Sequence, residues 1–322
     1  MDTLAVNFNM PVMVVNGAHP GPTFTVTGGT YPTEFCGVEA AGRLYRSVSP
    51  ANLTGKLIVV PVVNMPVLQF RSPMFALTES VSPFDGKMLA SVFPGDPAGS
   101  PTEVLAHVLF SRFIEPADFH VDLRGGDLSE SHMTHTIFLQ GVGGAEMDKR
   151  AREMGTVFGT RYCRHSRADV FDTKPGTLIY EAVQRGVPSI ISEAGTGYDQ
   201  QPAEKDVLTH VVGVTNLLHH AGMLPGPPRP PAGGPQLLLA PDFVDVKATV
   251  AGMFKHGPDR GDLVQHGGKV GVVADLDGTV LETLAAPVAG VVHEMMPRRL
   301  VYPGDTVYTL AVVDGNLTAG YA

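Results

Sequence analysis

The chain has little cysteine, few charged residues and no long apolar run. Its two cysteines, Cys36 and Cys163, are too few among 322 residues for a disulfide framework, and their spacing fits no metal-ligand motif. No apolar run reaches the length of about 18 residues that a membrane-spanning helix needs, and the N-terminus lacks the basic and apolar segments of a secretory signal. We therefore expect a cytoplasmic protein with no membrane partner.

Basic clusters and nucleotide-binding motifs are also missing. The net charge is −9 and no run of Lys or Arg occurs, which argues against nucleic acid or an anionic membrane surface as a partner. Gly28-Gly29 has no Gly-x-Gly-x-x-Gly continuation, and the chain contains neither a Gly-Lys-Ser/Thr loop nor a Gly-x-Ser-x-Gly elbow. The remaining composition, 43% apolar and 17% charged, is that of a soluble globular protein with room for two domains and a small-molecule partner.

Polar side chains lie at or just after the ends of three segments that are predicted to be buried strands. Residues 23–27, 117–124 and 187–193 are apolar or alternating, and each leads into a glycine, as strands of a parallel sheet do at their carboxyl ends. In an open α/β sheet, ligands bind in the crevice beyond these ends. The residues placed there, and therefore the candidate site residues, are Tyr31, Glu34, His120, Asp122, Arg124 and Glu193.

Helical patterns alternate with these strands. The alternation predicts an α/β fold with a mostly parallel sheet covered by helices on both faces. Two long loops are expected, at residues 49–57 and 75–99, and the second is rich in Ser, Pro and Gly and is expected to form a wall of the crevice. The predicted helices cover residues 37–45, 102–113, 144–158, 178–184 and 203–220.

Proline and glycine interrupt the chain after residue 224. Residues 225–236 cannot continue a helix or a central strand, so we expect a linker between a first domain over residues 1–224 and a second over residues 237–322. Short β-like runs separated by Gly-containing turns predict that the second domain is small and all-β. These runs cover residues 244–249, 269–274, 279–283, 290–294 and 306–313.

Two pieces of the second domain are similar to lipoyl-type barrel-sandwich domains. They are residues 286–292 (APVAGVV) and 301–308 (VYPGDTVY). No lysine stands at a hairpin tip, where a carrier domain would need one, so we expect a structural role. The domain would cover the crevice or mediate a homo-oligomer.

Several histidines are candidates for ligands or for core positions. His120 shares a strand face with Asp122 but lies deeper in the sheet, which favours a hydrogen-bonded core residue. His132 and His135 would share one face of a helix, whereas in an extended segment they would point to opposite faces. Both alternatives remain open from the sequence.

The segments around the three strand ends resemble the succinylglutamate desuccinylase and aspartoacylase family of zinc-dependent amide hydrolases. The similarity extends to residues 55–66 (GKLIVVPVVNMP), 82–86 (SPFDG) and 93–97 (FPGDP), and it covers nearly the whole chain. The resemblance implies a carboxypeptidase-like fold for the first domain. It also implies a small-molecule substrate.

The zinc-binding positions of that family hold different residues here. In the family, a His-Gly-Asp-Glu type loop and an Asp-Leu-His type strand end bind the metal, and the matching positions are Tyr31, Glu34 and Arg124. A guanidinium has no free lone pair and stays protonated, and a tyrosine would have to lose a proton with an ordinary pKa of about 10. We therefore expect no cofactor, and a salt bridge between Glu34 and Arg124 where the metal would be.

Other family positions are partly changed. The substrate-clamping Asn-Arg pair falls at Ala90-Ser91 and a further arginine falls near Ser80, so the acidic N-acyl amino acids typical of the family are not the expected substrates. Glu193, in the sequence Ser-Glu-Ala-Gly, stands where the family keeps its general base. Burial at a strand end would raise its pKa towards neutrality and suit it to proton transfer.

The leading hypothesis is an enzyme that acts on a small molecule without the family's zinc, by amide hydrolysis or another acid/base reaction. Glu193 would be the general acid/base, and Arg124 and Tyr31 would stabilise developing negative charge. The residues expected to bind the substrate are Glu34, His120 and Asp122.

Two alternatives remain. The first is a metal-dependent N-acyl amino acid deacylase, with zinc held by a rebuilt ligand set from Glu34 and His120, with or without one of His132 and His135. The second is a non-catalytic protein that binds a small molecule in the inherited crevice.

Overall fold

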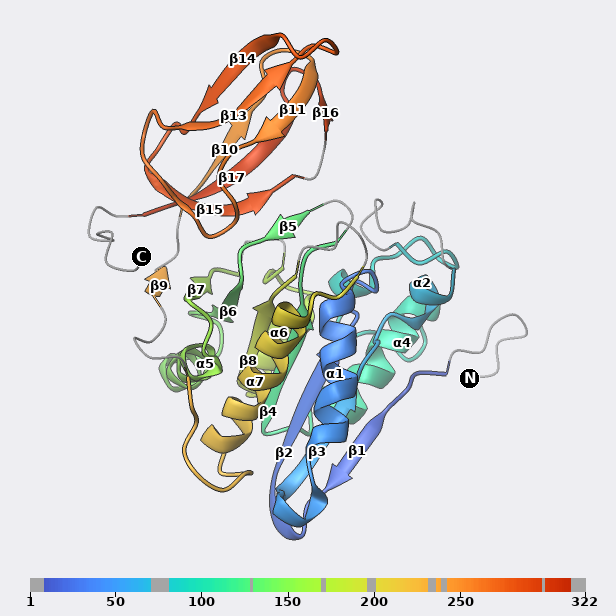
Figure 1. Ribbon diagram of the computed structural model, residues 1–322. Helices are drawn as coiled ribbons and strands as arrows, with labels where there is room; N and C mark the ends of the chain where they lie inside the picture. Colours follow the sequence, from blue (N-terminus) through green and yellow to red (C-terminus); the bar gives the residue numbers. More distant parts are fainter. Residues whose placement is uncertain are drawn as a thin grey trace.

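The first domain is built on one sheet of eight strands (Figure 1). The structure is a computed structural model, and it describes residues 9–70, 81–127, 130–168, 172–195, 201–230, 236–238, 242–296 and 299–313. Neighbouring strands are parallel except for the pairs β1 with β3 and β8 with β6, which confirms the expected mostly parallel sheet. The strand order is β1 (Met13–Asn16), β3 (Thr54–Val60), β2 (His19–Gly28), β4 (Phe119–Arg124), β8 (Ser189–Glu193), β6 (His135–Leu139), β7 (Tyr162–Ser166) and β9 (Gln236–Leu238).

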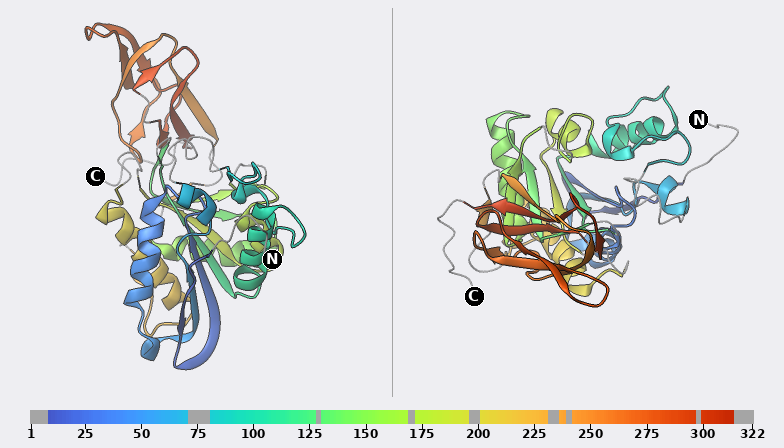
Figure 2. Two further views of the ribbon diagram at one scale, coloured as in Figure 1. Left: turned by 90° about the vertical axis from the view of Figure 1, so that its right-hand side faces the viewer. Right: turned by 90° about the horizontal axis from the view of Figure 1, so that it is seen from above.

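Helices cover both faces of this sheet, as the left view of Figure 2 shows. The helices α1 (Phe35–Ser47), α5 (Ala145–Phe158) and α7 (Glu204–His220) enclose the larger core on one face. The other face is covered by α4 (Pro101–Leu109), the π-helical turn η3 (Phe110–Ile114) and α6 (Leu178–Gln184). The shorter elements are η1 (Pro50–Asn52), α2 (Met65–Phe70) and η2 (Leu89–Ser91).

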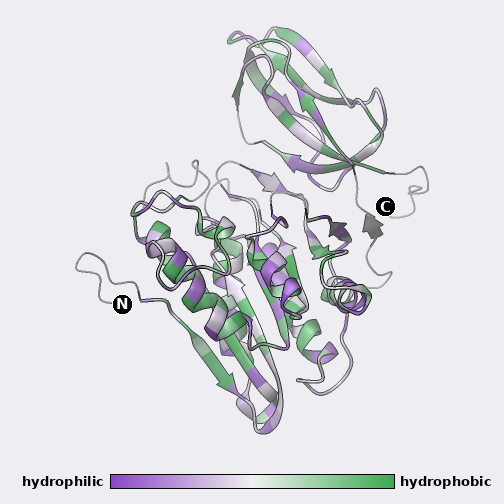
Figure 3. Cartoon of the chain, turned by 180° about the vertical axis from the view of Figure 1, so that it is seen from behind, coloured by the Kyte–Doolittle hydropathy of each residue, from purple (hydrophilic) through white to green (hydrophobic). Residues whose placement is uncertain are grey.

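Burial on both faces explains the apolar sequence of the central strands. Leu57 and Val59 of β3 pack against the α1 face, while Ile58 and Val60 pack against the α4 face. Parallel strands covered by helices on both sides have this continuous apolar character, without the polar alternation of a half-exposed strand. Figure 3 shows the sheet strands mostly in hydrophobic colours, whereas the helices carry hydrophilic residues as well.

The predicted helices are found, with differences at their ends. The pattern over residues 102–113 includes two elements, because the α-helix gives way to the π-helical turn after Leu109. The predicted loop over residues 49–57 is wrong, since β3 begins at Thr54 and pairs in parallel with β2. Polar residues at the start of that strand concealed it. Of the predicted loop 75–99, residues 75–80 lie outside the described part, and the rest includes η2.

The second domain consists of two antiparallel sheets that enclose their own core. This confirms the expected small all-β domain. One sheet has the order β10 (Phe243–Lys247), β17 (Thr306–Val312), β15 (Gly290–Met295) and β12 (Leu263–Val264). The other has the order β14 (Val280–Ala285), β13 (Lys269–Ala274), β11 (Gly252–His256) and β16 (Leu300–Val301).

Two short strands lie near the junction of the two domains. After the proline-rich segment, β9 pairs with β7 and extends the first sheet, so the predicted boundary at residues 236/237 falls inside a strand of the first domain. The strand β5 (Ser131–His132) leaves the first domain and pairs with β15 of the second, as Figure 1 shows. Within the described residues, no helix is both long and apolar enough to span a bilayer.

Candidate functional site

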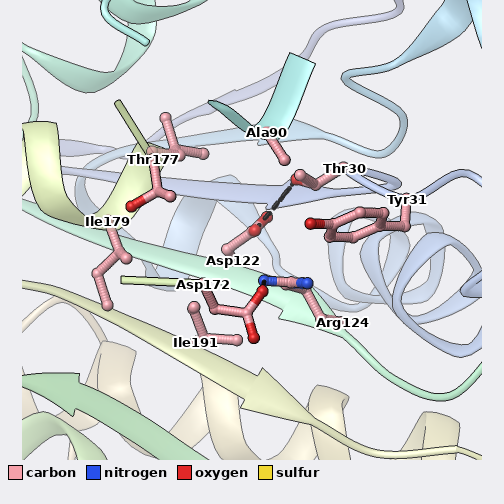
Figure 4. Close-up of a pocket in the computed structure, with 10 residues that line it drawn as sticks. Thr30, Tyr31, Ala90, Asp122, Arg124, Asp172, Thr177, Ile179 and Ile191 are labelled. Atoms are coloured by element: carbon pink, nitrogen blue, oxygen red, sulfur yellow. Dashed lines mark hydrogen bonds and ion pairs between the residues drawn. The ribbon is translucent and has the colours of Figure 1, made fainter. Parts of the chain in front are cut away.

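The candidate site lies where β2, β4 and β8 end. The loop after β2 carries Tyr31 and leads to Glu34, which immediately precedes α1. Arg124 is the last residue of β4 and lies opposite Glu193, the last residue of β8. The structure therefore brings these four predicted site residues together, and all four are buried. Figure 4 shows how Tyr31 and Arg124 line the adjacent pocket.

The Arg124 guanidinium is the centre of this group. Its Nη1 donates to Asp172 Oδ1 at 2.9 Å, and its Nε lies 3.8 Å from the Oε1 atoms of both Glu34 and Glu193. The guanidinium carbon is 4.4 Å from the centre of the Tyr31 ring, in cation–π geometry. Although burial disfavours the charge, the surrounding acids hold the pKa of Arg124 well above its usual value. The expected contact with Glu34 is present, and Arg124 is a fixed cation.

The acids around this cation differ in their proton affinity. Burial raises the pKa of Asp172, but Arg124 outweighs it and holds that pKa below its ordinary value. Burial raises the pKa of Glu34 well above its ordinary value and that of Glu193 to about 7, because Arg124 only partly offsets the loss of water. Asp172 is therefore the ionised partner of Arg124, while Glu193 can gain or lose a proton near neutrality.

Three polar atoms at the centre of the group have no hydrogen-bond partner among the described residues. They are Arg124 Nε, Glu34 Oε2 and Glu193 Oε2, and all three are buried. Buried polar groups in native proteins are almost always hydrogen-bonded, and an unmade bond costs about 1–3 kcal/mol. Each of these atoms can form a hydrogen bond with a water molecule or with a polar group of a ligand.

Tyr31 retains its proton at the site. Burial raises its pKa well above the ordinary value, and the charge of Arg124 lowers it only in part. Figure 4 shows its hydroxyl directed into the pocket, towards Asp122 and Thr30. Tyr31 can therefore donate a hydrogen bond to a ligand, whereas a metal would need it deprotonated.

A small pocket opens beside Arg124. Ala90 lies on its wall, at the position expected to carry the family's clamp, while Ser80 lies outside the described residues. Arg124 is the only basic residue of the lining, against two acids, Asp122 and Asp172. The other lining residues are Thr30, Tyr31, Thr177, Leu178, Ile179 and Ile191.

Asp122 is held in place by two hydroxyl groups. Thr27 Oγ1 donates to its Oδ1 at 2.6 Å, and Thr30 Oγ1 is 3.1 Å from both carboxylate oxygens. Burial raises the pKa of Asp122 above its ordinary value, and the nearby Arg124 and the two hydroxyls limit that rise. The structure thus gives this predicted substrate-binding residue a fixed orientation on the pocket wall.

His120 is not brought to the pocket. Its Nε2 is 3.0 Å from Thr27 Oγ1 and its Nδ1 is 2.6 Å from Ser189 Oγ, so both ring nitrogens are engaged inside the sheet. The side chain is fully buried, and this burial lowers its pKa to about 3. Its location corresponds to the core position favoured by its depth in the strand. A direct role in binding substrate, or a ligand set with Glu34, finds no support in this geometry.

The segment with His132 and His135 is extended, which settles the open alternative. His135 Nδ1 donates to the Met133 carbonyl at 2.8 Å, and its Nε2 accepts from Arg164 Nε at 3.2 Å. His132 lies on β5, and its Nε2 is 3.1 Å from Glu130 Oε1. These two histidines therefore have different hydrogen-bond partners, although both rings pack against His293.

Asp172 is a member of the site that the sequence did not reveal. It lies in a loop after β7, next to the lysine, proline and glycine of residues 174–176. Nothing in the spacing of this loop points to the crevice, and an acidic residue between turn-forming residues is ordinary in a solvated loop. Only the folded chain brings it within 2.9 Å of Arg124.

The fold and site together define a carboxypeptidase-like scaffold with a buried cation of the protein, Arg124, at the ends of its central strands. Zinc at the family position would need donors from Tyr31, Glu34 and residue 124. Arg124 is a protonated guanidinium with its Nε 3.8 Å from Glu34, so a divalent ion bound there would meet a fixed positive charge. The residues present do not fit the ion.

The chain belongs to the succinylglutamate desuccinylase/aspartoacylase family, because the catalytic domain of that family matches residues 20–221. A curated relative, the N-alpha-acetyl-L-2,4-diaminobutyric acid deacetylase of Halomonas elongata, is 29% identical over 320 residues, which is 96% of this chain and 87% of the relative. The resemblance inferred from the strand ends is thus confirmed.

Solved structures agree with this assignment. The product-bound ectoine utilization protein EutE (DoeB) of Ruegeria pomeroyi is 26% identical, with a TM-score of 0.79 over 94% of this chain and 89% of that chain. A succinylglutamate desuccinylase/aspartoacylase from Rhodobacter sphaeroides is also 26% identical, with a TM-score of 0.77 over 94% and 88% of the two chains. The similarity includes the second domain, since it extends well beyond residue 221.

Proposed function

We propose that this protein is an amide deacylase of small molecules that works without zinc at the Glu34 position. Membership of the family favours amide hydrolysis over other acid/base reactions. The observation that carries the proposal is the contact of Arg124 with both Glu34 and Glu193, at 3.8 Å each. It joins a fixed cation to a carboxylate whose pKa burial raises to about 7.

In the proposed reaction, ionised Glu193 removes a proton from a water molecule while the water oxygen bonds to the substrate carbonyl carbon. The carbonyl electron pair moves to its oxygen, and the resulting oxyanion is stabilised by Arg124 and by the Tyr31 hydroxyl. Protonated Glu193 then gives its proton to the amide nitrogen as the C–N bond breaks. The products are a carboxylic acid and an amine, and Glu193 returns to its starting state.

The charge of the pocket favours a neutral or cationic N-acyl compound. The one cation of the described lining, Arg124, is paired with Asp172, so the pocket has no second cation to bind a substrate carboxylate. Asp122 adds a second acid to the lining. The related deacetylase is named for an N-acetylated diamino acid, a compound class with a free amino group that would suit such a pocket.

The test is amine release from a panel of N-acetyl amino and diamino acids, measured for the wild type and for Glu193→Gln. We expect the substitution to reduce kcat by about 10²–10⁴-fold, because it removes the proton acceptor. Glu146→Gln, at an exposed position of α5, is the matched control and should be fully active. In the wild type, kcat/KM should rise with pH through about 7 as Glu193 ionises.

Arg124→Met provides an independent test of the stabilising cation. Loss of a fixed donor to an oxyanion lowers kcat by about 10²–10³-fold. The proposal fails if Glu193→Gln keeps more than a tenth of the wild-type rate. It also fails if no compound of the panel is turned over while ligands still bind, which would identify a binding protein.

A further inference from the structure

The junction between the two domains contains a second group of buried titratable side chains. The strands β5 and β15 pair antiparallel, with His132 opposite Glu294. The Met133 amide donates to the His293 carbonyl at 2.8 Å, which extends the pairing by one residue. One histidine of the first domain therefore meets a histidine and a glutamate of the second.

A β-bulge directs both residues of the second domain towards this junction. The register of β15 against β17 shifts between Val292 and Glu294, so His293 is the extra residue. In a regular strand, neighbours point to opposite faces, but a bulge changes the direction of the extra side chain. Potential ligand atoms of His132, His293 and Glu294 consequently lie within 4.8 Å of one another.

His293 is a buried imidazole without a hydrogen bond. Its side chain is 7% exposed, and neither ring nitrogen has a partner among the described residues. Its ring packs 4.6 Å from Phe243, 5.1 Å from His135 and 5.7 Å from His132, measured between ring centres. His135 cannot satisfy it, because both of its nitrogens are already engaged. An unpaired buried imidazole is costly, so the site implies a ligand.

We propose that His132, His293 and Glu294 bind one zinc ion between the domains. Two imidazoles and a carboxylate form a common zinc ligand set, which leaves a fourth position for water. The ligands of a tetrahedral zinc with bonds of about 2.0–2.2 Å lie about 3.4 Å apart, so small side-chain rotations are enough to close this group around the ion.

Glu130 is placed to orient one of the ligands. Its Oε1 is 3.1 Å from His132 Nε2, and His132 Nδ1 is buried and has no partner among the described residues. A metal-binding histidine usually donates its other ring N–H to a carboxylate, which fixes the ring and increases its basicity. This contact leaves Nδ1 of His132 as the ligand atom, and Glu130 acts as a positioning residue.

The protonation of the two imidazoles is compatible with this role. Burial, His135 and the charge of Arg164 lower the pKa of His293 well below its ordinary value, so its ring is neutral and can donate a lone pair. Burial also lowers the pKa of His132, but Glu130 outweighs this and raises it to about 10. Zinc therefore has to displace a proton from His132, as it does from the ligands of other zinc sites.

This site is separate from the metal position of the family. Its proposed ligands are other residues than Tyr31, Glu34 and Arg124, although the charge of His132 lowers the pKa of Glu193. The inference does not depend on the chemistry proposed for Glu193. A zinc ion here would link β5 to β15 and so hold the second domain against the first. Its loss should loosen the domain junction without removing any group from the Arg124 pocket.

The experiment is to measure the zinc content of the full chain purified without chelator, and then to titrate the metal-free protein with Zn²⁺ by calorimetry. We expect one zinc per chain in the wild type. Binding should weaken at least 100-fold in His293→Asn and in Glu294→Gln, and by about 10–100-fold in Glu130→Gln, which removes only the orienting carboxylate. His256→Gln, at an exposed position of the same domain, is the matched control and should bind like the wild type.

Thermal unfolding of each metal-free variant, with and without Zn²⁺, guards against misfolding as the cause of lost binding. Zinc should raise the Tm of the wild type and of His256→Gln, and leave that of Glu294→Gln unchanged. The proposal is overturned if the folded wild type binds no zinc. It is equally overturned if His293→Asn and Glu294→Gln bind zinc as tightly as the wild type does.

Discussion

The stability of the protein should depend on pH through the carboxyl groups beside Arg124. Glu193 has a folded-state pKa of about 7, above its ordinary value of 4.5, because burial outweighs the attraction of Arg124. A carboxyl group with a raised folded-state pKa stabilises the fold while it is protonated. The stabilisation is complete below about pH 4.5 and is lost as pH rises to about 7, since the unfolded chain then binds fewer protons than the folded one.

The size of this effect follows from the same values. A pKa that moves from 4.5 to about 7 corresponds to about 3 kcal/mol of unfolding free energy lost across that range. This figure is an upper bound, because Glu34 shares Arg124 and its proton uptake is linked to that of Glu193. In Glu193→Gln, which cannot ionise, the contribution of this group should disappear, whereas Glu294, whose pKa is also raised to about 7, keeps its own contribution.

The assay is urea unfolding at a series of pH values from 4.5 to 8. The wild type and the exposed control Glu146→Gln should lose stability along the same slope, while Glu193→Gln should lose up to about 3 kcal/mol less than the wild type across this range. Equal m-values would show that the substitution left the unfolding reaction unchanged. Parallel curves for the wild type and Glu193→Gln would refute the assignment of a raised pKa to this residue.

The remaining predictions concern packing and the buried cation. Arg124→Met should lower the free energy of unfolding at pH 7 by about 3–5 kcal/mol, because it leaves Asp172 as an unpaired buried charge. We expect the lower end of this range, since Glu34 can be neutral when the cation is removed. A loss below 1 kcal/mol in urea unfolding would contradict the buried ion pair of Arg124 with Asp172. Gly213→Ala would place a Cβ 2.1 Å from the buried Phe158 ring and should cost about 1–3 kcal/mol. Gly42→Ala, whose nearest neighbour is 3.5 Å away in α1, should instead stabilise the protein by about 0.5–1 kcal/mol, so equal effects in thermal melts would contradict this packing.

Hydrophobic periodicity was enough to predict most of the fold. The strand that ends at Glu193 is mostly apolar, and the strand that ends at Arg124 alternates apolar and polar residues. Both are followed by a glycine within two residues, and these patterns predicted where the strands end. The strand β3 was partly missed because its first three residues, beginning at Thr54, are not apolar and are only partly buried or exposed. Pairing with β2, a contact distant in sequence, is what makes that segment extended.

The sequence allowed a prediction where the chemistry of one side chain excludes a role, such as metal binding by Arg124. It did not reveal contacts between residues that are distant in the chain. The exclusion of Arg124 as a metal ligand needed only its protonation, and its pairing with Glu34 followed from desolvation. Asp172 was missed because its loop has no periodicity. The grouping of His132 with His293 was missed because a bulge and a contact between two domains create it, and neither leaves a pattern in the chain.

The central claim is that the cation at the strand ends is Arg124. It is tested most directly by anomalous diffraction at the zinc edge, on crystals of the wild type grown with Zn²⁺ and without chelator. We predict no anomalous peak among Tyr31, Glu34 and Arg124, with the guanidinium resolved between Glu34 and Glu193. A fully occupied peak coordinated by Glu34 would contradict the account.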